Sequence, residues 1–170
     1  MDVLLQVKNL SVRYRSEGMA TPAAVMGVCF EIAAGEVVGL VGESGCGKTT
    51  VARALLGLLP HSAESGGEMI LQGRDMRSMD ERGLERIRGA EIFLISQEPS
   101  LALSPVLQAG EQIAEALHAH REWGWKQCRT EAESWLGRVG LEPAARFFRA
   151  YPHQLSGGQL QRVALAQGLA

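Results

Sequence analysis

Eight consecutive residues, GESGCGKT at positions 42–49, constrain the fold of this chain more than any other segment. Their three glycines allow the backbone to curl, so that successive N–H groups point toward one centre. A short valine-rich run at 37–41 comes directly before this loop, and residues 49–59 carry apolar side chains at helical spacing. A strand, a glycine loop and a helix in immediate succession predict half of a βαβ unit and therefore an α/β fold.

The same loop has the residue types that hold the phosphates of a nucleotide. Lys48 can reach the β- and γ-phosphates as a point charge, and the Thr49 hydroxyl is placed to coordinate Mg²⁺. The alternative is a structural glycine turn before a helix, but the chain has only three lysines and one stands in this slot. The predicted phosphate-binding residues are Gly42, Glu43, Ser44, Gly45, Cys46, Gly47, Lys48, Thr49 and Thr50.

Composition narrows the class of protein. The net charge of −2 gives no general attraction to nucleic acid, and no apolar stretch is long enough to predict a membrane span. The N-terminus carries an acid where a signal peptide has basic residues, so no signal peptide is expected. Cys29, Cys46 and Cys128 are widely spaced, and this pattern indicates reduced thiols in a cytosolic protein, with no Cys/His metal site.

The rest of the chain alternates between strand and helix patterns. Besides the run at 37–41, strands are expected at 3–14 (as a strand or hairpin), 25–32, 68–72 and 91–96. Besides residues 49–59, helices are expected at 80–88, within 106–139 and at 160–170. No internal repeat and no low-complexity tract is present.

A second glycine motif, LSGGQ at 155–159, is followed by LQRVALA at 160–166. By itself, a serine-glycine-glycine turn is only a flexible loop that caps a helix. Downstream of a phosphate-binding loop and joined to such a helix, it resembles the signature motif of the ABC ATPases. In that family the signature of one subunit closes over the ATP held by the other, which implies a head-to-tail dimer. The residues concerned are Leu155, Ser156, Gly157, Gly158 and Gln159.

The resemblance gives a role to two further residues. Gln97 stands at the end of the expected strand 91–96, where the family has a catalytic-site glutamine that senses Mg²⁺ and the γ-phosphate. Tyr14 stands where an aromatic side chain commonly stacks on adenine. Without the family context, Gln97 would be a solvated loop residue and Tyr14 a half-buried strand residue.

Three segments, 97–106, 110–115 and 151–158, look like the oligopeptide, dipeptide and nickel importer branch, which usually has Asp and Asn in place of Glu98 and Ser104. This likeness implies an ATP-binding subunit, peripheral on the cytoplasmic face of the inner membrane, that uses ATP and Mg²⁺ to drive import of a peptide or nickel. The implied partners are transmembrane permease subunits, a second ATP-binding subunit and, indirectly, an extracytoplasmic solute-binding protein, but no nucleic acid. Two alternatives stay open: a soluble ABC ATPase outside transport, and a module that only binds nucleotide.

The family resemblance also implies an architecture. We expect a RecA-like P-loop NTPase core with an N-terminal antiparallel β part in residues 1–99, an inserted helical subdomain in 100–155, and the signature loop and helix in 156–170. In the family, an Asp-Glu pair and a switch histidine follow the signature helix, and His153 precedes the signature. The 170 residues are therefore expected to be one ABC ATPase domain, incomplete at its C-terminus, with hydrolysis expected only of the full-length protein.

Overall fold

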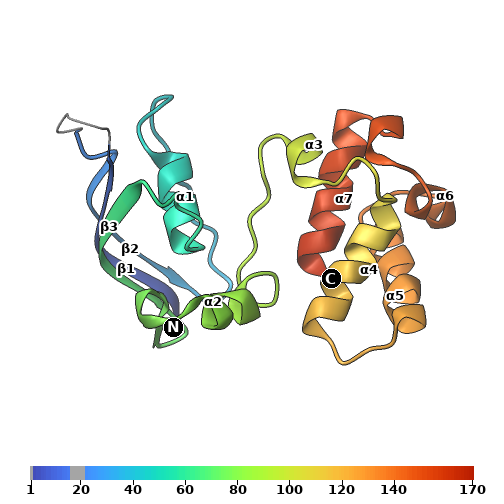
Figure 1. Cartoon of the computed structure of the whole chain (residues 1–170), viewed down its shortest axis with the longest axis horizontal. Helices are drawn as coiled ribbons and strands as arrows, with labels where there is room; N and C mark the ends of the chain where they lie inside the picture. The colour runs from blue at the N-terminus through green and yellow to red at the C-terminus, as the bar shows by residue number, and fades with distance from the viewer. Residues whose placement is uncertain (1, 16–21) are drawn as a thin grey trace. The chain divides into compact units, whose positions relative to one another are not determined.

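The computed structural model describes residues 2–15 and 22–170. These residues divide into two compact units, Met1–Glu85 and Arg86–Ala170, and each unit is described by itself (Figure 1). Within the described residues, none of the helices has the length and apolar character that crossing a membrane requires.

The first unit is built on an antiparallel sheet of four strands in the order β2-β1-β3-β4. The strands are β1 (Val3–Tyr14), β2 (Val25–Ala33), β3 (Ala63–Leu71) and β4 (Arg74–Asp75). β1 lies between β2 and β3 and pairs antiparallel with both, which confirms the N-terminal antiparallel β part (Figure 1).

A change of phase in β1 explains its apolar pattern. Leu5 and Val7 are buried at odd positions, whereas Leu10 and Val12 are buried at even positions. Asn9 has a φ of 53°, and the register with β2 shifts between Val7 and Leu10. This irregularity acts as a β-bulge, which lets both halves of the strand bury their side chains on the same face.

Three short helices complete this part of the chain: α1 (Lys48–Leu55), the 3₁₀ turn η1 (Met76–Ser78) and α2 (Glu81–Ile87). α1 buries Val51 and Ala54 and packs beside β1. It ends four residues earlier than the sequence pattern predicted, because Gly57 has a φ of 64° and reverses the chain.

The second unit is helical. Its elements are α3 (Pro99–Ala102), α4 (Ala109–His120), α5 (Trp125–Arg138), α6 (Ala144–Phe148), the 3₁₀ turn η2 (Pro152–Gln154) and α7 (Gly157–Leu169). Figure 1 shows α4, α5 and α7 side by side, and the helices expected within 106–139 and at 160–170 are thereby confirmed. The core consists of Leu103, Ala109, Ile113, Ala114, Leu117, Cys128, Ala132, Leu136, Leu141, Phe147, Leu160, Val163 and Ala166.

The strands expected at 37–41 and 91–96 are wrong for this structure: among the described residues, neither run belongs to a sheet. Val37 and Val41 are 97% and 92% exposed. An apolar run becomes a strand only when neighbouring backbone supplies hydrogen bonds, and the described residues place no strand beside either run. Within the run at 91–96, Ile92 forms an isolated β-bridge with Arg88.

Candidate nucleotide-binding site

Glycine geometry shapes the loop that precedes α1. Gly45 and Gly47 have φ values of 82° and 97°, a region that glycine enters without steric cost. A Cβ atom built on Gly47 would lie 2.5 Å from the carbonyl oxygen of Ala24. The loop therefore passes so close to the backbone before β2 that position 47 accommodates no side chain.

The ammonium group of Lys48 lies inside the curl of this loop. Its Nζ donates hydrogen bonds to the carbonyl oxygens of Gly42, at 2.8 Å, and Glu43, at 2.6 Å. It also lies 3.7 Å from Sγ of Cys46. The backbone at the start of the loop thus holds the positive charge of Lys48 within the curl, which is where an anion would be bound.

The N-terminus of α1 adds to this positive potential. The first turn holds no acidic side chain, and no side chain caps the helix at Gly47. The first N–H groups of any helix have no partner within it, and the helix dipole is positive at this end. Thr49 is exposed in the same turn. A loop that holds an ammonium beside free amides and a hydroxyl can bind a phosphate chain.

Tyr14 lies against the same helix. The phenolic oxygen is 3.2 Å from Oγ1 of Thr50, so a hydrogen bond joins the end of β1 to α1. The sequence pattern did not reveal this contact, because the two residues are far apart in the chain. The structure thus brings Tyr14 together with the phosphate-binding loop, while stacking on adenine stays a prediction.

The second glycine motif also stands at a helix N-terminus. Ser156 caps α7: its Oγ accepts a hydrogen bond from the N–H of Gln159 at 3.4 Å, and its own N–H donates to the Gln159 side chain at 2.8 Å. Gly157 and Gly158 are exposed, and a Cβ at either position would meet no atom within 4 Å. Leu155 packs against the core and anchors the loop. The motif is a capped turn whose two glycines are open to solvent.

Gln97 is exposed and lies just before α3, in the helical unit. The structure therefore groups the predicted residues in two sets. Tyr14 and the phosphate-binding loop are together in the first unit, and Gln97 is in the second unit with the signature loop.

The side chains predicted to bind Mg²⁺ fit that ion only together with phosphate oxygens. Within residues 2–15 and 22–170, no group of three or more His, Cys, Asp or Glu side chains could hold a metal ion. The predicted ligands are the Thr49 hydroxyl and the Gln97 amide oxygen. Mg²⁺ prefers oxygen ligands and is commonly bound through a few protein oxygens together with substrate phosphates, so this donor set suits that ion.

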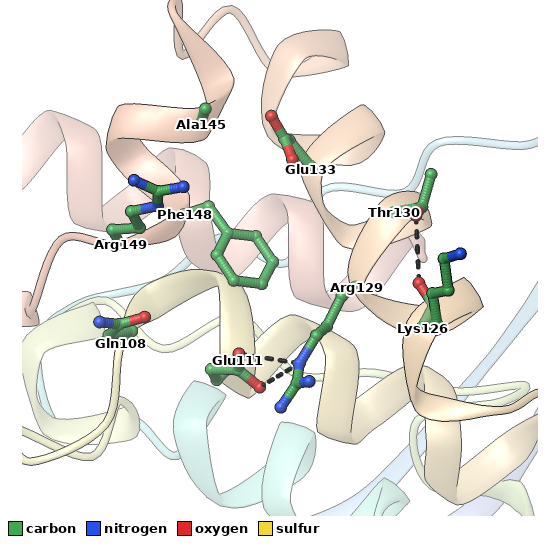
Figure 2. A pocket seen from close by; sticks show the side chains of 9 residues that line it. All are labelled: Gln108, Glu111, Lys126, Arg129, Thr130, Glu133, Ala145, Phe148 and Arg149. Carbon is green, nitrogen blue, oxygen red and sulfur yellow. Dashed lines mark hydrogen bonds and ion pairs between the residues drawn. The ribbon is translucent and has the colours of Figure 1, made fainter.

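A pocket in the helical unit was missed by the sequence reasoning. It has a volume of about 440 Å³ and lies among α4, α5 and α6. Figure 2 shows Phe148 at its centre, with the ion pair between Arg129 and Glu111 below it and Arg149 beside it. The charged lining comes from residues distant in sequence and belongs to no motif, so no local signal could have identified it.

Comparisons with known proteins point to one family. Residues 25–170 match a protein family described as "ABC transporter". The chain is 42% identical to the oligopeptide transport ATP-binding protein OppD of Mycobacterium tuberculosis, over 100% of the chain and 28% of that protein. It is 39% identical to the dipeptide transport ATP-binding protein DppD of Bacillus subtilis, over 99% of the chain and 51% of that protein. The chain thus spans about half, or less, of the length of these curated relatives.

Comparison with solved structures points to the same family. The dimeric post-hydrolysis state of the ATP-binding cassette MJ0796, bound to ADP and Pi, aligns with a TM-score of 0.85 at 30% identity. The alignment covers 98% of this chain and 69% of that one. A second dimeric structure of MJ0796, described as a bacterial ABC transporter cassette, aligns with a TM-score of 0.84 at 31% identity.

Proposed function

The chain belongs to the ABC transporter family, and from this premise we propose that it forms the nucleotide-binding part of an importer's ATP-binding subunit. The observation that carries the proposal is the loop at 42–49, in which backbone carbonyls hold the Lys48 ammonium at the N-terminus of α1. The proposal also includes three parts of the domain: the β part and P-loop core in 1–99, the helical subdomain in 100–155, and the signature loop and helix in 156–170.

In this proposal the loop binds the phosphates of ATP. The Lys48 ammonium exchanges its carbonyl partners for β- and γ-phosphate oxygens, which carry more negative charge than a carbonyl. Tyr14, fixed by its contact with Thr50, stacks on the adenine ring. Bound Mg²⁺ neutralises charge on the phosphates, and the Thr49 hydroxyl and Gln97 amide oxygen would hold it.

The signature loop serves the nucleotide of a partner subunit. Oγ of Ser156 accepts a hydrogen bond from Gln159, so the hydroxyl proton remains available to donate to a phosphate oxygen. The exposed amides of Gly157 and Gly158 add donors at the positive end of the α7 dipole. An arrangement with its donors outward suits an anion brought by another molecule, and the cassette MJ0796 is described as dimeric.

The proposed cargo is a peptide or a similar small solute. Support comes from the names of the relatives, which include ATP-binding proteins of oligopeptide transport, dipeptide transport and glutathione import. Nickel remains a second cargo within the same branch. The proposed partners are transmembrane permease subunits, a second ATP-binding subunit and, indirectly, a solute-binding protein. The proposed location is the cytoplasmic face of the inner membrane.

The decisive experiment is transport. The ATP-binding subunit carrying this sequence is reconstituted with its permease in vesicles, and uptake of a labelled dipeptide is measured with and without MgATP, with Ni²⁺ as a competitor. ATP-dependent uptake that Lys48→Ala abolishes supports the proposal. Hydrolysis that neither permease nor peptide alters would instead indicate a soluble ABC ATPase. Nucleotide binding without hydrolysis would indicate a binding module.

A further inference from the structure

Gln112 is the one buried polar side chain among residues 2–15 and 22–170, at 6% exposed. Its amide makes three hydrogen bonds to one loop. Oε1 accepts from the N–H of Ser104 at 2.8 Å, and Nε2 donates to the carbonyl oxygens of Ser104 and Leu107, both at 3.1 Å. Burying an amide is costly unless its hydrogen bonds are made, so the loop and the side chain hold each other in place.

This loop is the connection from α3 to α4, and it follows Gln97 closely in the chain. Leu103 is buried in the helical core, whereas Val106 and Leu107 are 77% and 38% exposed. Apolar burial therefore anchors the loop at one residue only. The Gln112 amide adds three further fixed points through backbone groups, independently of which side chains the loop presents to solvent.

Gln112 also contacts the signature helix. Its backbone carbonyl oxygen lies 3.5 Å from Nε2 of Gln167, a residue of α7. α3 and α4 both pack against α7 as well. The segment after Gln97 and the helix that Ser156 caps therefore meet at one residue of α4.

We propose that Gln112 is a positioning residue, which holds the segment after Gln97 and the signature helix α7 as one rigid body during ATP turnover. The proposal rests on the proposed function. Gln97 is expected to sense the subunit's own ATP, and Ser156 the ATP of the partner. Because a fixed link joins Gln97 and Ser156, a displacement of one residue also displaces the other. This coupling coordinates the two nucleotide sites of a dimer.

The neighbouring residue on α4 has a separate task, which makes a clean test possible. Glu111 pairs with Arg129 of α5 at 3.0 Å and lines the pocket in Figure 2. A substitution of Gln112 leaves this pair in place. Gln127, exposed on α5, provides a matched control for the loss of a glutamine side chain in the same unit.

The test compares Gln112→Leu with Gln127→Leu in the ATP-binding subunit assembled with its permease. Leucine fills a similar volume and makes none of the three hydrogen bonds. We expect the Ser104 amide to exchange its hydrogen about tenfold faster and kcat for ATP hydrolysis to fall about tenfold. KM for ATP should stay within about twofold, because the phosphate-binding loop is in the other unit. Gln127→Leu should change none of these quantities.

A second variant separates positioning from folding. Gln112→Glu retains an acceptor for the Ser104 N–H and loses both bonds to the carbonyl oxygens. We expect kcat to fall again with KM unchanged, while the Ser104 amide stays protected. An unchanged kcat in a folded Gln112→Leu or Gln112→Glu subunit would overturn the proposal. It would also be overturned if neither variant showed a cooperative thermal unfolding transition. Failure of the proposed function gives a different result, because the unmodified transporter would then not couple ATP hydrolysis to solute uptake.

Discussion

Replacing Gly47 with alanine should damage the phosphate-binding loop by an amount that the structure allows us to calculate. The residue has a φ of 97°, and holding an alanine in this left-handed region costs about 1–2 kcal/mol. The new Cβ would lie 2.5 Å from the Ala24 carbonyl oxygen and 3.1 Å from Cγ2 of Val25. Relieving such an overlap costs roughly a further 1–3 kcal/mol. The expected loss of unfolding free energy is therefore about 2–5 kcal/mol, the sum of the two contributions.

The overlap cannot be relieved by rotating a side chain, because the nearest atom belongs to the backbone. The N–H of Ala24 donates to the carbonyl oxygen of Val12 at 2.8 Å, which ties the segment to β1. The loop must therefore move instead, and the carbonyl groups of Gly42 and Glu43 would no longer converge on the Lys48 ammonium. We expect weaker binding of MgATP together with the lower stability.

Gly45→Ala is the matched control. Gly45 has a φ of 82°, but a Cβ there would meet no atom within 4 Å, so only the backbone strain of about 1–2 kcal/mol applies. Denaturant unfolding of both variants, with equal m-values, measures the two losses. If Gly47→Ala costs no more than Gly45→Ala, the close approach to Ala24 does not limit this position and the reasoning is refuted.

Three further outcomes are expected. Lys48→Ala should remove tight MgATP binding, because the loop loses the charge that faces the β- and γ-phosphates, and an unchanged affinity for a fluorescent ATP analogue would contradict the assignment. Ser156→Arg should leave ATP binding by one subunit nearly intact and abolish turnover, because the signature serves the partner's nucleotide; loss of both together would argue against the head-to-tail dimer. Leu136→Ala should lower the unfolding free energy by about 2–5 kcal/mol, because Leu136 is fully buried among the helices and its truncation leaves a core cavity. A loss below about 1 kcal/mol in denaturant unfolding would show that the core collapses around the smaller side chain.

Much of the fold was predictable from local patterns. Strands of the β part, and the helices α4, α5 and α7, follow from apolar residues at periods of two and 3.6, whereas the antiparallel arrangement was implied by the family resemblance. The bulge at Asn9 was not predicted, although the change from odd to even apolar positions within β1 is its signal. The runs at 37–41 and 91–96 carry the composition of buried strands, but pairing depends on neighbours that composition does not specify.

Gln112 illustrates the limit for individual residues. Its spacing of three from the buried Ala109 places it on the apolar side of α4, which is the one local signal of its burial. A glutamine in a helix is usually solvated, so the sequence alone favours an exposed side chain. Only the loop that folds over α4 supplies the backbone groups that make its burial favourable.

The sequence by itself determined the chemistry of both loops and the family. Glycine conformations, the lysine, the threonine and the capping serine act within a few consecutive residues, so the order of amino acids is sufficient to specify them. Tertiary structure alone decided which distant groups meet: the Ala24 carbonyl against Gly47, the Tyr14 hydroxyl against Thr50, and the Gln112 amide against its loop. Such contacts depend on how separate elements pack, because each joins segments whose proximity arises only when the sheet or the helical core has formed.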